Sequence, residues 1–82
     1  MDEDVQAQVE SQRKTMTDAA IVRIMKARKS LDIGSLVMEA IRQLSVRFEP
    51  SSSDIKKRVE DLIERDYLER DASDNKILTY CA

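Results

Sequence analysis

The chain contains no histidine and a single cysteine among its 82 residues. Without histidine, a nucleophile of the Ser-His or Cys-His type is excluded. Cys81 has no partner for an internal disulfide, and one thiol with scattered carboxylates forms no recognisable set of metal ligands. We therefore expect no metal and no other cofactor.

Aromatic residues are also scarce, since Phe48, Tyr67 and Tyr80 are the only three. The core must then consist mostly of Ile, Leu, Val and Met, which favours the packing of helices. A chain of this length forms one small domain, which buries about 60% of the surface that the unfolded chain exposes. We expect a single core.

An excess of positive charge and long apolar runs are missing as well. The net charge is -2, whereas dedicated nucleic-acid binders usually carry a basic excess. No run of residues is apolar enough to span a membrane, and no signal peptide is recognisable. We therefore expect no membrane and no nucleic acid among the partners, and an intracellular location.

Residues 1–16 differ in composition from the rest of the chain. Apolar residues are sparse in this segment, and its Gln, Glu, Arg and Lys residues favour a helix without providing a buried face. We expect an N-terminal extension over residues 1–16, partly helical or frayed, and one folded domain over residues 17–82. Thr17 and Asp18 offer a helix cap if the chain breaks between the two parts.

Apolar periodicity predicts two core helices before Pro50. The first runs to about Lys29 or Ser30, and the mixed residues 31–34 suit a strand of two or three residues. The second helix has apolar residues at helical spacing, which are Ile33, Leu36, Val37, Ala40, Ile41 and Leu44. Phe48 closes this region before Pro50.

A third helix and a hairpin complete the chain. Ser51 to Asp54 combine cap candidates with an acidic first turn, and the helix that follows carries Ile55, Val59, Leu62 and Ile63 on one face. The segments 67–70 and 76–81 flank a polar turn and predict a β-hairpin. Three helices followed by a hairpin is the order of a winged helix, a mainly α fold with a small β wing.

One lysine of the first core helix has no acidic neighbour. On a helical wheel the predicted buried arc centres on Ile24 and contains Ala20, Ile21, Ala27, Arg28 and Leu31. Lys26 lies on the opposite side, and no carboxylate stands three or four positions away to hold its amine. Its predicted surroundings are a basic and apolar surface made of Val22, Arg23, Met25 and Lys29. The same pattern is also typical of an ordinary solvated helix face with residues at the rim of the core.

The string Ala19–Lys29, AAIVRIMKARK, closely resembles the neddylation-site helix of the cullins, the scaffold subunits of multi-subunit ubiquitin ligases. Residues 55–60, 62–70 and 80–82 also resemble the C-terminal domain of this family, nearest the cullin-three branch. The resemblance implies a winged-helix fold and implies that Ala82 is the natural C-terminus. It further implies that Lys26 is the acceptor of a ubiquitin-like modifier through an isopeptide bond.

The resemblance also implies how the domain acts and with which partners. A conjugating enzyme carries the modifier as a thioester, which the amine of Lys26 attacks. Attachment activates the transfer of ubiquitin to substrates by a RING-type ligase, in which this domain is a non-catalytic part of the scaffold. The implied partners are the modifier, its conjugating enzyme, the RING-box subunit and the rest of the cullin scaffold.

DNA binding through the third helix is the alternative function, because many winged helices read DNA in this way. Residues 55–66 hold four basic and four acidic side chains. Lys56 with Glu60, Lys57 with Asp61, and Asp61 with Arg65 are spaced for ion pairs within the helix. Acidic side chains on this face repel phosphate, so we expect a solvated face with ion pairs rather than a DNA-reading face.

Overall fold

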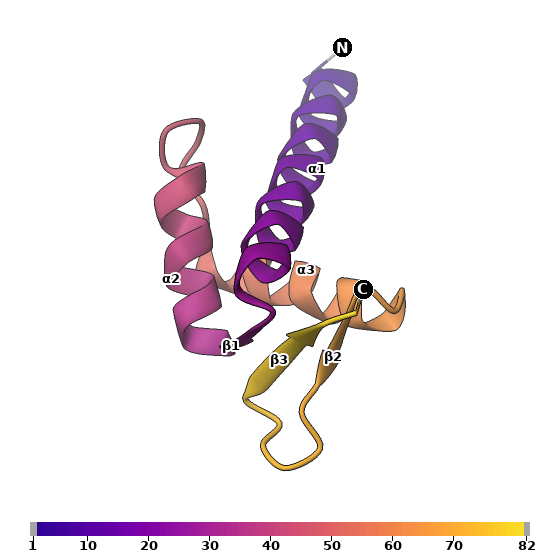
Figure 1. The fold of residues 1–82 in the computed structure, drawn as a ribbon. Coiled ribbons are helices and arrows are strands. Elements are labelled where there is room, and N and C mark those ends of the chain that lie inside the picture. The colour runs from indigo at the N-terminus through magenta and orange to yellow at the C-terminus, as the bar shows by residue number, and fades with distance from the viewer. Residues whose placement is uncertain (1, 82) are drawn as a thin grey trace.

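The structure is a computed structural model that describes the backbone of residues 2–81 and the side chains of residues 9–81. Its elements are, in chain order, α1 (Asp2–Arg28), β1 (Ser30–Asp32), α2 (Ile33–Leu44), α3 (Ser52–Glu64), β2 (Leu68–Arg70) and β3 (Ile77–Tyr80). The three helices and the C-terminal hairpin confirm the predicted winged helix (Figure 1).

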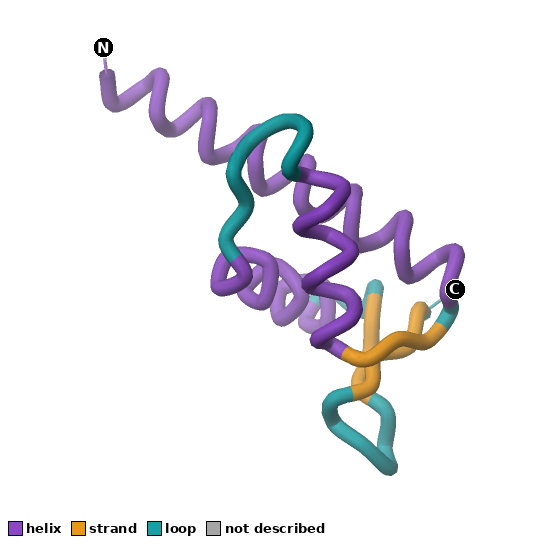
Figure 2. Tube along the Cα trace, turned by 90° about the vertical axis from the view of Figure 1, so that its left-hand side faces the viewer, coloured by secondary structure: helices purple, strands orange, loops and turns teal. Residues whose placement is uncertain are grey.

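The strands form one antiparallel sheet in the order β1-β3-β2. Leu31 pairs with Leu78 across β1 and β3, and Leu68 pairs with Tyr80 across β2 and β3. The short strand expected after the first core helix is thus β1, which joins the hairpin as a third strand. Figure 2 shows the loop between β2 and β3 projecting away from the helices as the wing.

The core lies where the three helices and the sheet meet. Its buried side chains are mostly aliphatic, as the scarcity of aromatic residues predicts, and they are Ala20, Ile21, Ile24, Met25, Leu36, Val37, Ala40, Leu44, Ile55, Val59, Leu62, Leu68 and Leu78. Phe48 and Tyr80 pack against this cluster from its edge. None of the described helices has a stretch that is long and apolar enough to cross a membrane.

Side-chain caps begin both of the shorter helices. Ser51 is the N-cap of α3, and its hydroxyl accepts a hydrogen bond from the backbone N–H of Asp54, which confirms the predicted start. Asp32 is the N-cap of α2 and accepts from the backbone N–H of Ser35 at 3.0 Å. Its hydrogen bonds with Ser35 lower the pKa of the Asp32 carboxyl, because they stabilise the charged form.

The first helix is longer than the expected core helix, and no cap interrupts it. It continues from Asp2 to Arg28 through Thr17 and Asp18, the two residues that the sequence offers as a cap. The Thr17 hydroxyl donates to the backbone carbonyl of Arg13 at 2.7 Å, and the Asp18 carboxylate binds a side chain of α3 instead of a backbone N–H. The division into an extension and a domain after residue 16 stays a prediction, and residue 16 lies within one continuous helix.

The predicted buried arc of α1 is correct for Ala20, Ile21 and Ile24 but wrong for Ala27 and Arg28, which are exposed. The helix packs against both α2 and α3, so its buried stripe is centred between Ile21 and Ile24 and extends to Met25. Arg28 instead reaches Glu39 of α2 at 3.2 Å. The position of a neighbouring helix, rather than the apolar pattern alone, sets the centre of the buried stripe.

Candidate modification site

Lys26 lies on the last turn of α1, and its side chain is exposed. Among the described side chains, it takes part in no ion pair. Arg23, one turn earlier on the same side, is also exposed. The amine of Lys26 therefore projects from the helix end into solvent and into a positively charged neighbourhood.

The chain leaves α1 sharply, three residues after Lys26. Lys29 has a φ of 70°, in the left-handed region, and its N–H donates to the Met25 carbonyl at 2.7 Å. Its own carbonyl accepts from the N–H of Tyr80 at 2.8 Å, which joins the helix end to β3. The ammonium of Lys29 lies over the Tyr80 ring, 5.5 Å from its centroid. The end of α1 is thus held by the last strand of the sheet.

The four residues expected around Lys26 divide into three groups. Arg23 and Lys29 are exposed, and together with Lys26 they form what we call the basic patch. Val22 is half-buried and packs against the core. Met25 is 0% exposed, so its assignment to a surface beside Lys26 is wrong. Consecutive helix residues point about 100° apart, which places Met25 toward the core when Lys26 faces solvent.

The absence of an ion pair does not single out Lys26. Of the three pairs expected within α3, only Asp61 with Arg65 forms, at 2.9 Å. Lys56 and Lys57 have no ion pair among the described side chains, because Glu60 binds Arg70 of β2 and Asp61 binds two arginines. Arginines rather than lysines bind these two carboxylates, because the two-pronged guanidinium group fits a carboxylate better than an ammonium group does.

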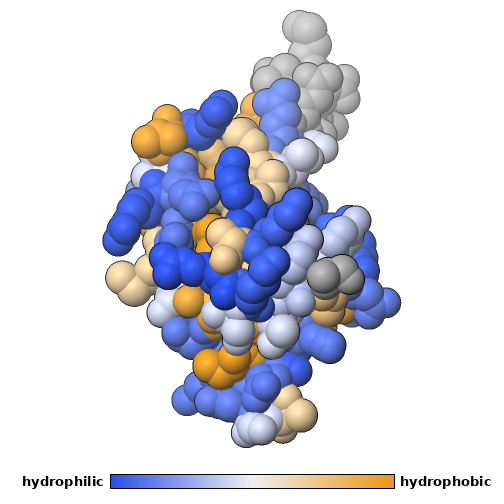
Figure 3. Space-filling model, viewed as in Figure 1, coloured by the Kyte–Doolittle hydropathy of each residue, from blue (hydrophilic) through white to orange (hydrophobic). Residues whose placement is uncertain are grey.

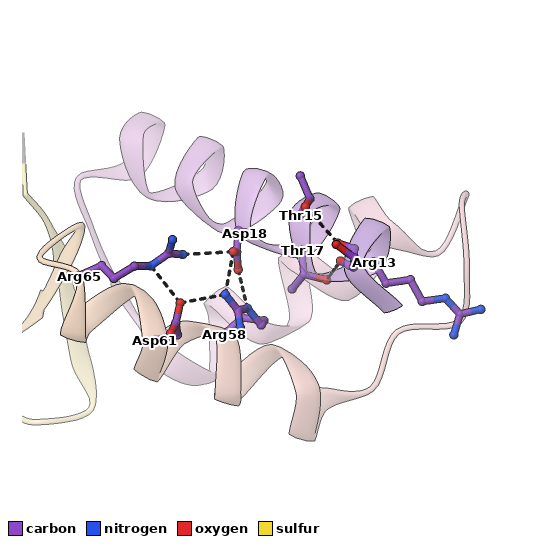
Figure 4. A network of polar contacts seen from close by, with 8 residues as sticks. Arg13, Thr15, Thr17, Asp18, Arg58, Asp61 and Arg65 are labelled. Carbon is purple, nitrogen blue, oxygen red and sulfur yellow. Dashed lines mark hydrogen bonds and ion pairs between the residues drawn. The ribbon is translucent and has the colours of Figure 1, made fainter. Parts of the chain in front are cut away.

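Two aspartates and two arginines fasten α1 to α3, and we call them the α1–α3 clamp (Asp18, Arg58, Asp61 and Arg65; Figure 4). Arg58 donates to Asp18 from Nε at 2.7 Å and from Nη2 at 2.8 Å, and it also donates to Asp61 at 2.8 Å. Arg65 reaches Asp18 at 3.3 Å and Asp61 at 2.9 Å. The hydrogen bond with Asp18 and the nearby carboxylates raise the pKa of Arg58 above its usual range.

The clamp holds α1 about two turns before Lys26. No local pattern in the sequence predicts the clamp, because Asp18 and Arg58 are 40 positions apart. The backbone under Lys26 is therefore held on both sides, by the clamp toward the N-terminus and by the junction with β3 toward the C-terminus. The Lys26 side chain itself is exposed.

Elsewhere on the described surface there is a cleft but no metal site. A cleft of about 460 Å³ lies between α1, the loop after α2 and the start of α3, and side chains of both charges line it. No group of three or more side chains within the described residues is arranged to hold a metal ion. Hydrophilic residues cover most of the face seen in Figure 3, with apolar ones scattered between them.

Comparison with known proteins identifies the family. Residues 12–74 match the model of the cullin protein neddylation domain. The chain is 49% identical to Cullin-3A of Arabidopsis thaliana over 80 residues, which cover 98% of this chain and 11% of that protein. It is 54% identical to Cullin-3 of Dictyostelium discoideum and 51% identical to Cullin-1 of Oryza sativa subsp. japonica, each over 74 residues that cover 90% of this chain and 10% of the relative.

The chain thus spans about a tenth of the length of these curated relatives. Because a Cullin-1 is as similar as the Cullin-3 proteins, the cullin-three branch stays a prediction. A solved structure described as "A Dual E3 Mechanism for Rub1 Ligation to Cdc53: Dcn1(P)-Cdc53(WHB)" matches with a TM-score of 0.91 and 34% identity, over 100% of this chain and 94% of that chain. The chain belongs to the cullin family and is a cullin neddylation domain with a winged-helix fold.

Proposed function

We propose that Lys26 is the residue of this neddylation domain that accepts the ubiquitin-like modifier. The observation that carries the proposal is the position of the exposed Lys26 amine at the end of a helix that is held on both sides of this residue. The basic patch around it also suits a negatively charged partner surface. Lys26 lies inside the segment that matches the neddylation-domain model.

The reaction needs no catalytic group from this chain. The conjugating enzyme brings the modifier as a thioester, and the neutral amine nitrogen of Lys26 attacks the thioester carbonyl carbon. A carbon–nitrogen isopeptide bond forms, the carbon–sulfur bond breaks, the enzyme leaves with its thiol, and the proton of the amine passes to solvent. The chain contributes a nucleophile in a defined position, and the enzyme that delivers the modifier contributes the activated carbonyl.

The partners proposed for this chain follow from its family. The matched solved structure concerns Rub1 ligation to Cdc53 and includes Dcn1 with the Cdc53 domain. For this chain we propose a modifier of the same kind, its conjugating enzyme, a RING-box subunit and the rest of a cullin scaffold. Within such a ligase the modification activates transfer of ubiquitin to substrates, in the cytoplasm and nucleus.

Reconstituted modification of the chain, joined to a cullin scaffold that recruits the RING-box subunit, tests the proposal. Lys26→Arg keeps the charge and removes the primary amine, so we expect the modified product to disappear. Lys57→Arg is the matched control, because Lys57 is also an exposed lysine on a helix without an ion pair among the described side chains. A dominant isopeptide at another lysine in the wild type, found by peptide mass spectrometry, would contradict the assignment.

DNA binding remains the alternative function, and the observation in its favour is that Lys56 and Lys57 form no ion pair with any described side chain. Against it, the outward side of α3 also carries Glu60 and Glu64, and the wing carries Asp71 and Asp74 near its tip. We therefore expect no duplex binding in the micromolar range at physiological salt. Tighter binding, with a strong dependence on salt concentration, would favour the alternative.

A further inference from the structure

Two lysines lie close to the end of α1, and their surroundings differ. Lys26 and Lys29 are both exposed and are three positions apart. The other basic residues here, Arg23 and Arg28, carry guanidinium groups that stay protonated and do not act as amine nucleophiles. If Lys26 accepts the modifier, Lys29 is its nearest competitor for the same thioester.

Lys29 differs from Lys26 in its backbone conformation and in the contact of its side chain with an aromatic ring. Its backbone has the left-handed conformation and binds both Met25 and Tyr80, so it belongs to the junction between helix and sheet. Its Nζ lies 5.5 Å from the centroid of the Tyr80 ring, within the range of a cation–π interaction. The Lys29 ammonium must leave the ring before it can reach a thioester.

We propose that Tyr80 determines the specificity of modification, because it holds Lys29 over its ring and leaves Lys26 as the accessible amine. This inference rests on the proposed role of Lys26. An exposed cation–π contact corresponds to about a two- to fivefold preference for the engaged position.

Substitution of the Tyr80 ring separates this contact from the rest of the junction. The hydrogen bond to the Lys29 carbonyl comes from the backbone N–H of Tyr80, so a side-chain substitution leaves its donor in place. Tyr80→Leu keeps an apolar side chain against the core but removes the aromatic face, whereas Tyr80→Phe keeps the face and removes only the hydroxyl. Tyr80→Phe is therefore the control that keeps both the ring and its contacts with the core.

The experiment measures the ratio of isopeptide at Lys29 to isopeptide at Lys26. The chain is joined to a cullin scaffold, modified in a reconstituted reaction and analysed by peptide mass spectrometry. We expect Lys26 to dominate in the wild type and in Tyr80→Phe, and the ratio to rise about two- to fivefold in Tyr80→Leu. An equal ratio in Tyr80→Leu and Tyr80→Phe would overturn the role of Tyr80.

A chemical measurement makes the inference independent of the enzymes. Brief labelling of the free amines with an acetylating ester, followed by peptide mapping, compares the rates at Lys26 and Lys29. We expect slower labelling at Lys29 than at Lys26 in the wild type, and a smaller difference in Tyr80→Leu. If the wild type is modified mainly at a lysine other than Lys26, the proposed function fails. If Lys26 is modified but neither ratio responds to Tyr80→Leu, only the role of Tyr80 fails.

Discussion

The guanidinium of Arg58 binds both carboxylate oxygens of Asp18, at 2.7 and 2.8 Å, although the two residues are 40 positions apart in the chain. Both side chains are about one-fifth exposed. The pair is therefore better shielded from water than an ordinary surface ion pair, and its two parallel hydrogen bonds define one orientation of α1 on α3. The orientation of α1 in turn determines where its last turn, which contains Lys26, lies relative to α3.

Removal of Asp18 should destabilise the fold. In Asp18→Ala, Arg58 loses its two-pronged partner in a partly buried place, and we expect the free energy of unfolding to fall by about 1.5 to 3 kcal/mol. Urea unfolding followed by circular dichroism measures this change. The control is Glu64→Ala on the exposed side of α3, where we expect a change within about 0.5 kcal/mol. Equal effects of the two substitutions would show that the α1–α3 clamp does not contribute to stability.

The burial of Met25 predicts different effects for the same substitution at two methionines. Met25→Ala leaves a cavity between α1 and the rest of the core, so we expect a loss of about 2 to 5 kcal/mol in the free energy of unfolding. Met38 is 68% exposed on α2, and Met38→Ala should change this free energy by no more than about 0.5 kcal/mol. Similar losses at both positions would contradict the burial of Met25.

The cap of α2 should make part of the stability depend on pH. Hydrogen bonds to the charged Asp32 carboxylate hold its pKa below the ordinary value of 3.8. A carboxyl with a lowered folded pKa stabilises the fold above its unfolded pKa, and this contribution is lost as the pH falls toward the folded value. The melting temperature of Asp32→Ala should therefore lie below that of the wild type at pH 7.

Melting curves from pH 7 down to pH 2 test this expectation. The difference between wild type and Asp32→Ala should narrow as the pH falls below 3.8. Asp32→Asn is the matched control, because an amide oxygen also caps a helix but carries no charge that pH could remove. If the melting temperature of the wild type exceeds that of Asp32→Ala by the same amount at every pH, the charged carboxylate has no role in this stabilisation.

Cys81 should react slowly with alkylating reagents. Partial burial raises the pKa of its thiol, and the nearby carboxylates of Glu69 and Asp66 raise it further, so less of the reactive thiolate is present at a given pH. We expect the rate of iodoacetamide labelling to reach its midpoint at a higher pH in the folded chain than in urea. Glu69→Gln should move the midpoint part of the way back, and coincident pH profiles of the folded and unfolded chains would refute the shift.

Local patterns in the sequence determined much of this protein. The apolar spacing from Ile33 to Leu44 predicts α2, the serines before Asp54 predict the start of α3, and the alternation around the polar turn at 71–75 predicts the wing. The same patterns placed Lys26 on the exposed side of its helix. Each of these features depends on residues within a few positions of one another, so the spacing of apolar and polar residues is sufficient to predict it.

Only the tertiary structure decided how these elements meet. Met25 is buried because both α2 and α3 pack on α1, and the lysines of α3 lost their expected partners to Arg58, Arg65 and Arg70. The contact of Lys29 with Tyr80 joins positions that are neighbours only because β3 pairs with β1. Such contacts depend on the relative placement of whole elements, which the packing of the common core determines and no short stretch of sequence encodes.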